Sequence, residues 1–141
     1  MEPSLRERRK KPVFKTVLIY EDFAAGVRAR RFCERLVRRL GRTLEEQIWK
    51  FDVLGIREVR NLAAGAARKA DVVIVSVSGR TELPHTAQGW LNMWLWLLEA
   101  ENPALVVLFD SCARQNNEPI RAYLGSIAQR GEIAFFQNEV S

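Results

Sequence analysis

Apolar, β-branched runs alternate with helix-length amphipathic stretches along most of the chain, and this alternation restricts the fold more than any other feature. The runs at residues 71–77 and 104–109 are apolar at successive positions, as in strands that are buried on both faces. Doubly buried strands joined by helix-length segments indicate a parallel sheet, because parallel neighbours require crossover connections. We therefore predict five strands, at residues 13–20, 47–53, 71–77, 104–109 and 133–136.

The segments between these strands have the spacing of amphipathic helices. In the first of them, Ala25, Ala29, Phe32 and Leu36 recur at helical intervals, and Gly41 marks the end. Four helices are predicted, at residues 24–40, 56–69, 89–100 and 117–130. Five parallel strands with such helices most often form a three-layer, flavodoxin-like α/β domain with strand order 2-1-3-4-5, in which the polar second strand lies at an edge.

The predicted fold lacks one of its usual parts, the helix that follows the fifth strand and packs beside the first helix. Only five residues follow the strand at 133–136, which is too few for a helix of ordinary length. One face of the later strands is therefore expected to lack an intramolecular cover, which a partner subunit or the N-terminal segment would supply. Residues 13–141 are predicted to form a single domain, preceded by a basic, flexible tail at residues 1–12.

Positive charge is concentrated in the first third of the chain. Residues 1–42 contain 13 basic and 5 acidic side chains, whereas residues 43–141 contain 9 basic and 12 acidic ones, within a formal net charge of +5. The first helix has a stripe of arginines opposite its apolar face, and we interpret this stripe as a basic surface made of Arg28, Arg31, Arg35, Arg38, Arg39 and Arg42.

This basic surface has two interpretations. One is an ordinary solvated helix face, and the other is a binding surface for phosphates, nucleic acid or an acidic protein. No aromatic residue alternates with the arginines, and no nucleic-acid motif accompanies them. Nucleic-acid binding is therefore possible but not favoured.

Polar side chains follow three of the predicted strands, at the edge where open α/β sheets bind ligands. The loop at residues 78–88 is longer than most connections between a strand and a helix, and it combines hydroxyls, a glycine and an arginine that suit a phosphate. It matches no standard phosphate-binding motif, so an ordered structural loop is the alternative interpretation. The candidate ligand-binding residues at this edge are Glu21, Asp22, Ser78, Arg80, His85 and Asp110.

The acidic pair Glu21–Asp22 at the end of the first strand resembles the start of response-regulator receiver domains. That resemblance implies two carboxylates that hold magnesium beside a phospho-accepting aspartate. The chain has Ser76 and Ser78 where the family has the acceptor aspartate, and Gln137 where it has a lysine. We therefore predict a degenerate, receiver-like domain that is not phosphorylated on aspartate, in which Asp22 caps the first helix.

A second resemblance is to TIR domains. It rests on the strand at residues 70–76 and on a following helix with Trp94, Trp96 and Glu99. Some members of that family hydrolyse NAD with a helix glutamate near this position, so the resemblance implies an alternative enzymatic function. The spacing here does not reproduce the family's Trp-Cys-x-x-Glu, and a shared fold alone does not carry function.

The predicted third helix is apolar nearly all the way round. With Trp90 and Trp94 toward the sheet, the flanking or outer positions hold Met93, Leu95 and Trp96. Exposed tryptophan and methionine are enriched at protein interfaces, so these three residues are candidates for an interface. We expect a homodimer, or docking of another protein, on this helix or on the uncovered face of the sheet.

Several functional classes are not expected. No apolar run reaches the 18–20 residues or so of a membrane span, and the N-terminal residues have no apolar core of a secretory signal. Cys33 and Cys112 are isolated, so we expect neither a disulfide framework nor a metal site, and no cofactor is implied. The first hypothesis is therefore a cytoplasmic, non-catalytic interaction domain, with binding of a nucleotide or phosphate ligand as the alternative.

Overall fold

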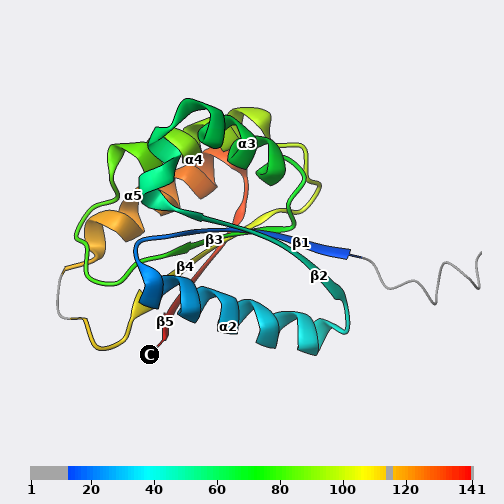
Figure 1. The fold of residues 1–141 in the computed structure, drawn as a ribbon, viewed down its shortest axis with the longest axis horizontal. Coiled ribbons are helices and arrows are strands. Elements are labelled where there is room, and N and C mark those ends of the chain that lie inside the picture. The colour runs from blue at the N-terminus through cyan, green and yellow to red at the C-terminus, as the bar shows by residue number, and fades with distance from the viewer. Residues whose placement is uncertain (1–12, 114–115, 141) are drawn as a thin grey trace, which may run out of the picture.

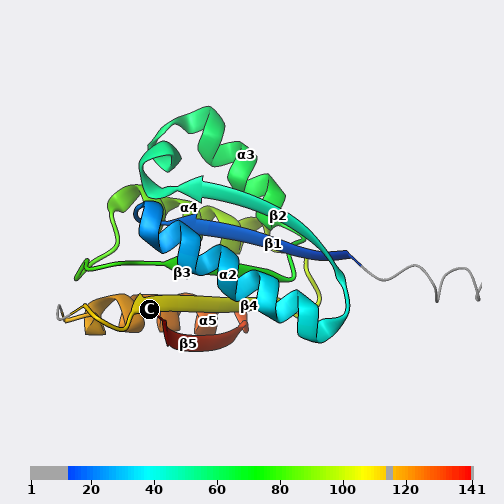
Figure 2. The same ribbon diagram turned by 60° about the horizontal axis from the view of Figure 1, so that its bottom comes forward.

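The computed structural model describes residues 13–113 and 116–140, which form one five-stranded sheet with helices on both faces (Figure 1). All neighbouring strands are parallel, and their order across the sheet is β2-β1-β3-β4-β5 (Figure 2). This arrangement confirms the predicted three-layer, flavodoxin-like fold. The strands are β1 (Val13–Tyr20), β2 (Thr43–Lys50), β3 (Val72–Ser76), β4 (Ala104–Asp110) and β5 (Ala134–Val140).

In the part of the chain that the structure describes, four α-helices and one short 3₁₀ helix connect the strands. They are α2 (Phe23–Leu40), η1 (Phe51–Gly55), α3 (Arg57–Ala67), α4 (His85–Leu97) and α5 (Glu118–Gly131). None of the helices in the described ranges is both long and apolar enough to cross a membrane. The predicted tail at residues 1–12 lies outside the described residues.

Three predicted elements had boundaries that were wrong by several residues, and one of them is the last strand, which ends at Val140 rather than at residue 136. The second strand begins at Thr43 rather than at residue 47, and the alternation of Trp49, Phe51 and Val53 combines a strand end with the 3₁₀ helix η1. Phe51 is buried, but it belongs to this 3₁₀ helix and not to the strand. The helix α4 begins at His85 rather than at residue 89, directly after Pro84, a residue that suits the start of a helix.

The face of the sheet that carries α3, α4 and α5 holds most of the core (Figure 1). Its cluster contains 24 buried apolar residues, compared with 8 in the cluster on the opposite face. At its centre Trp90 and Trp94 are stacked with ring centroids 6.3 Å apart, and the indole Nε1 of Trp94 donates a hydrogen bond to the carbonyl oxygen of Ala67. The two indoles thus fill the space between the sheet and the three helices.

Within the described residues, the opposite face carries α2 alone (Figure 1). Five strands spaced about 4.8 Å apart span about 19 Å, which is room for two helices of about 10 Å diameter. In the described part of the chain, α2 is the single helix on this face, and no helix follows β5. The prediction of an uncovered face beside the first helix is therefore confirmed for these residues.

Local signals fix both ends of α2. At its start, the Asp22 carboxylate accepts a hydrogen bond of 2.9 Å from the backbone amide of Ala25, which confirms Asp22 as the N-cap. At its end, Gly41 adopts a left-handed conformation with φ of 64° and donates its amide to the carbonyl oxygen of Val37. The helix therefore begins at the carboxyl end of β1 and returns toward the amino end of the sheet.

Candidate functional site

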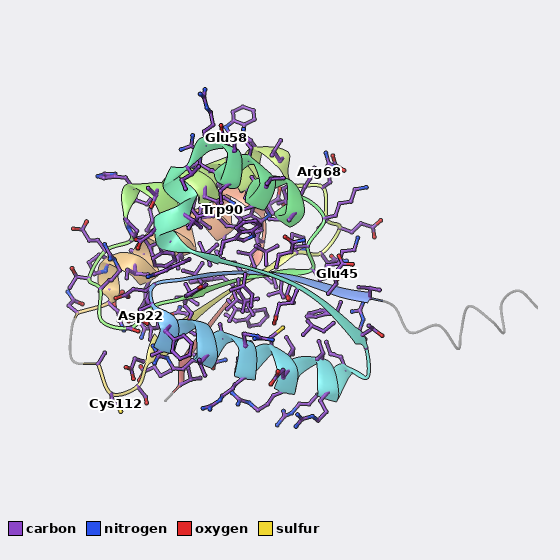
Figure 3. The ribbon with its side chains drawn as sticks, in the orientation of Figure 1. Asp22, Glu45, Glu58, Arg68, Trp90 and Cys112 are labelled. Carbon is purple, nitrogen blue, oxygen red and sulfur yellow. The ribbon has the colours of Figure 1, made fainter. Side chains whose placement is uncertain are left out.

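Polar side chains converge where β1, β3 and β4 end, as the sequence predicted for this edge. Figure 3 shows Asp22 at this end of the sheet and Arg68 at the other. The Glu21 carboxylate accepts a hydrogen bond of 2.8 Å from the backbone amide of Ser78, and the Ser78 hydroxyl donates one of 2.8 Å to the Asp22 carboxylate. We call the group the carboxyl-edge cluster; its members are Glu21, Asp22, Arg28, Ser78 and Asp110.

The guanidinium of Arg28 lies at the centre of the carboxyl-edge cluster. One terminal nitrogen donates to the Ser78 hydroxyl at 2.8 Å and to the Val77 carbonyl oxygen at 3.3 Å. The other lies 3.8 Å from a carboxylate oxygen of Asp110, and the Arg28 side chain is 9% exposed. The positive charge of the Arg28 guanidinium therefore lies at the junction between β1, β3 and β4. Many folds of this type bind ligands at this junction.

The ionisation of Asp22 is tuned by the same contacts. Burial opposes the charged form and would raise the pKa of Asp22, but this effect is outweighed. The Ala25 amide, the Ser78 hydroxyl and the nearby positive charges of Arg28 and Lys50 favour the carboxylate and hold its pKa below the ordinary value. Asp22 is therefore a charged structural group at neutral pH rather than a proton donor.

Two predicted ligand-binding residues lie outside this cluster. Arg80 is exposed and donates its Nε proton to the Glu82 carbonyl oxygen within its own loop. His85 is exposed at the first position of α4. The structure thus brings four of the six candidates together, namely Glu21, Asp22, Ser78 and Asp110.

The expectation that Arg28 belongs to the basic surface was wrong. It lies one helical turn before Phe32, on the flank of α2 nearest β4, and therefore turns inward to Asp110. Arg42 is also partly shielded from solvent, because its guanidinium lies 5.1 Å from the centroid of the Phe14 ring. The exposed members form the arginine face of α2, which consists of Arg31, Arg35, Arg38 and Arg39.

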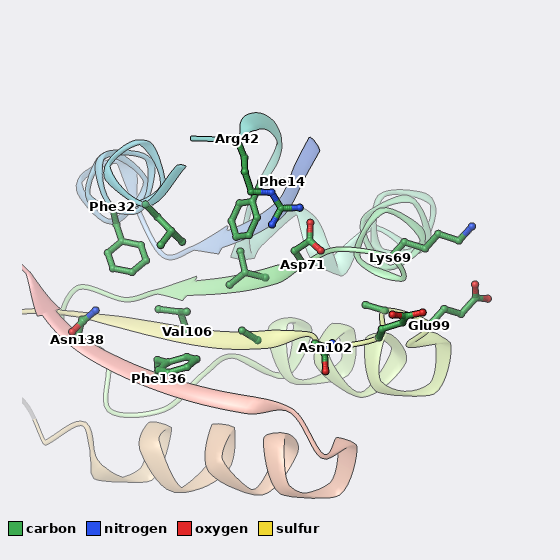
Figure 4. Close-up of a pocket in the computed structure, with 15 residues that line it drawn as sticks. Phe14, Phe32, Arg42, Lys69, Asp71, Glu99, Asn102, Val106, Phe136 and Asn138 are labelled. Atoms are coloured by element: carbon green, nitrogen blue, oxygen red, sulfur yellow. The ribbon is translucent and has the colours of Figure 1, made fainter. Parts of the chain in front are cut away.

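A groove of about 830 Å³ lies away from the carboxyl-edge cluster, on the α2 side of β3, β4 and β5 (Figure 4). Phe32 of α2 and Phe136 of β5 project into it from opposite sides, with Val106 of β4 between them in this view. Phe136 is 54% exposed, an unusual fraction for a phenylalanine in a sheet. We call this feature the α2-side groove, and its apolar lining includes Phe14, Phe32, Leu36, Val72, Val106 and Phe136.

Two of the three candidate interface residues on α4 have neighbours within the chain. Met93 and Leu95 are half-buried against the large core cluster, because α4 is flanked by α3 and α5 as well as by the sheet. Trp96, in contrast, is 89% exposed. The apolar character of α4 therefore reflects its central position among the helices, and of its three candidate interface residues Trp96 alone is exposed.

The residues at the functional positions of the receiver and TIR families form hydrogen bonds or ion pairs within this chain. Ser76 is buried and donates its hydroxyl proton to the Ala25 carbonyl oxygen, while Gln137 accepts a hydrogen bond from Arg121 of α5. Glu99 follows α4 at the amino end of the sheet, opposite the carboxyl-edge cluster, and its carboxylate lies 3.6 Å from Arg68. Among the described residues, no group of three or more His, Cys, Asp or Glu side chains is arranged to hold a metal ion.

Comparisons with known proteins add no assignment to this geometry. No protein-family model matches the chain, and no curated protein gives a significant match.

Proposed function

We propose that the chain is a non-catalytic, receiver-like domain that acts in the cytoplasm through protein–protein contacts at the α2-side groove. The observation that carries this proposal is the groove itself, because its apolar floor lies where the fold usually places a helix. Large exposed apolar patches with polar rims mark interaction sites in folded proteins. The exposed phenyl ring of Phe136 is the kind of aromatic anchor that such sites use.

The carboxyl-edge cluster supports a non-catalytic function. Glu21, Asp22 and Asp110 each accept a hydrogen bond or ion pair from within the chain, and Arg28 supplies the positive charge. Serines stand at the acceptor position, so the proposal includes no phosphorylation on aspartate. A network of this kind stabilises the junction between α2 and the strands, which is a structural role.

Photo-crosslinking in the cell of origin tests this function. We replace Phe136 by the photoreactive phenylalanine analogue benzoylphenylalanine and use Leu62 as the matched control, because Leu62 is an exposed apolar residue of α3 on the opposite side of the sheet. We expect a covalent adduct of defined mass from position 136 and none from position 62. An adduct of two chains identifies a homodimer, and any other mass identifies a partner; no adduct from position 136 contradicts the proposal.

The alternative function, binding of a nucleotide, NAD or phosphate at the carboxyl ends of the strands, predicts a different result. A thermal-shift series with nucleotides, NAD, phosphate and magnesium would then raise the melting temperature, since a ligand that binds the folded state stabilises it. We expect no rise. A rise that disappears in the Ser78→Ala variant would replace the interaction proposal with ligand binding at this edge.

A further inference from the structure

We propose that the α2-side groove binds an amphipathic helix with an acidic flank, supplied by a partner protein. This inference rests on the proposed function and names the chemistry of the occupant. The helix would lie beside α2 and over β3, β4 and β5, and its carboxylates would meet the arginine face. Binding of an amphipathic helix in an apolar groove is a general mode of peptide recognition.

The dimensions of the uncovered face match one helix. It offers the width of a second helix next to α2, by the spacing of the strands. The seven residues of β4 extend for about 23 Å at 3.3 Å per residue, and about 15 residues of α-helix cover the same length. A helix of about four turns would therefore bury the apolar lining with one face, and Phe32 and Phe136 would contact it from the two sides (Figure 4).

The charge beside the groove determines the second property of the occupant. Phe32 and Leu36 line the groove, and Arg35 and Arg39 follow Phe32 by three and seven positions, which places them on the same side of α2. Both arginines are exposed. Within residues 13–113 and 116–140, neither has an ion pair with a carboxylate. A helix that packs alongside α2 would therefore place its flank next to unpaired positive charge, and that flank should be acidic.

A second copy of the chain does not supply such a helix. No described helix has a net negative charge: α2 and α5 contain more arginines than glutamates, α3 contains Arg57 and Arg60 with one glutamate, and α4 contains no acidic residue. The N-terminal segment 1–12 contains five basic and two acidic residues, so it has the same sign as the arginine face. Like charges across an interface disfavour both occupants, which leaves a partner of opposite charge.

The groove also restricts where the acidic residues of the partner helix can lie. At the amino end of the sheet its rim combines Asp71, Glu99 and Glu101 with Lys69 and Arg42, and Glu99 is paired with Arg68. Carboxylates placed at that end would meet charges of both signs, whereas carboxylates along the flank next to α2 would meet unpaired arginines. The inference therefore concerns one flank of the helix rather than its overall charge.

A pair of designed peptides tests the inference with the full chain. Each has about 15 residues with leucine along one helical face; one has glutamate along the adjacent flank, and the other has lysine at the same positions. Fluorescence anisotropy of labelled peptides measures their dissociation constants. We expect the glutamate peptide to bind at least about tenfold more tightly, and its affinity to fall as salt is added.

Matched variants separate the contribution of charge from that of the groove. Arg35→Glu should weaken binding of the glutamate peptide about fivefold or more, whereas Arg57→Glu makes the same charge change on α3 and should have no effect. Phe136→Gln should weaken binding about tenfold, and Leu62→Gln should not. Circular dichroism confirms that each variant is folded.

The outcomes distinguish this inference from the proposed function. Equal affinity for the two peptides, or no effect of Arg35→Glu, overturns the acidic helix while the groove remains an interaction site. A crosslinked homodimer from position 136 together with no peptide binding assigns the groove to a second copy instead. No crosslink from position 136 and no peptide binding overturns the proposed function as well.

Discussion

The two faces of the sheet are held together in different ways. The face under α3, α4 and α5 is closed by apolar packing, with 24 buried residues around the stacked pair Trp90 and Trp94. The face under α2 has 8 buried apolar residues and an open groove beside them. A domain of this size can thus concentrate its apolar stabilisation on one face and leave the other available for contacts.

The attachment of α2 depends more on directional polar contacts. Four of them lie at the start of the helix or in its first turns: Asp22 binds the Ser78 hydroxyl, Ser76 binds the Ala25 carbonyl oxygen, and Arg28 binds Ser78 and Asp110. Hydrogen bonds with charged groups fix geometry more strictly than apolar packing does. The carboxyl-edge cluster therefore fixes α2 at one end, while its apolar side contacts the sheet along its length.

The largest expected effect tests the apolar face. Trp94→Ala removes a fully buried indole and its hydrogen bond to Ala67, so the free energy of unfolding should fall by about 3–5 kcal/mol. Urea unfolding of the purified variant measures this loss. A loss below about 1 kcal/mol would contradict the assignment of most apolar stabilisation to this face.

The second effect concerns the polar attachment of α2. Arg28→Met keeps the length of the side chain but removes its contacts with Ser78 and Asp110, and we expect a loss of about 2–4 kcal/mol in the free energy of unfolding. Arg31→Met is the matched control, because it changes an exposed arginine of the same helix and should cost less than about 0.5 kcal/mol. Equal losses in the two variants would show that the cluster does not fasten α2.

The pH dependence of this attachment follows from Asp22. Its pKa is lower in the folded chain than in the unfolded one, so its contribution to stability is complete above the ordinary value of 3.8 and is lost as the pH falls through the folded pKa. Asp22→Asn keeps a side chain that can cap α2 but cannot titrate. Denaturant unfolding across acidic pH should show a decline that is steeper in the wild type than in this variant, by less than about 1 kcal/mol in total. Parallel curves would assign the acid sensitivity to other carboxylates.

The smallest effect belongs to the open face. Phe136→Gln changes a ring that is already 54% exposed, and the free energy of unfolding should change by no more than about 0.5 kcal/mol in either direction. Phe136→Gln should therefore weaken peptide binding while leaving the free energy of unfolding almost unchanged. Trp94→Ala, in contrast, should lower the free energy of unfolding strongly. A cost above about 2 kcal/mol would show that Phe136 belongs to the structural core.

The sequence was sufficient for the order of the strands but not for the role of every polar residue. The β-branched runs that became β3 and β4 were recognisable because both faces of these strands are buried. The edge strands were harder to delimit: β5 pairs with β4 as far as Val140, and its polar residues Gln137 and Glu139 bind Arg121, contacts that no local pattern indicates. Periodicity alone placed Arg28 with the surface arginines, because it gives the angle of a side chain around a helix but not its ionic partner on a distant strand.

The stacked pair Trp90 and Trp94 makes the two faces spectroscopically distinguishable. With centroids 6.3 Å apart and ring planes at 13°, the two buried indoles have a fixed, asymmetric packing and should contribute to the near-ultraviolet circular dichroism signal. Both rings are enclosed on the face opposite α2, so loosening of α2 should leave this signal unchanged, and disruption of the helical layer should abolish it. The intrinsic chromophores can therefore report whether the domain opens one face at a time or unfolds as a whole.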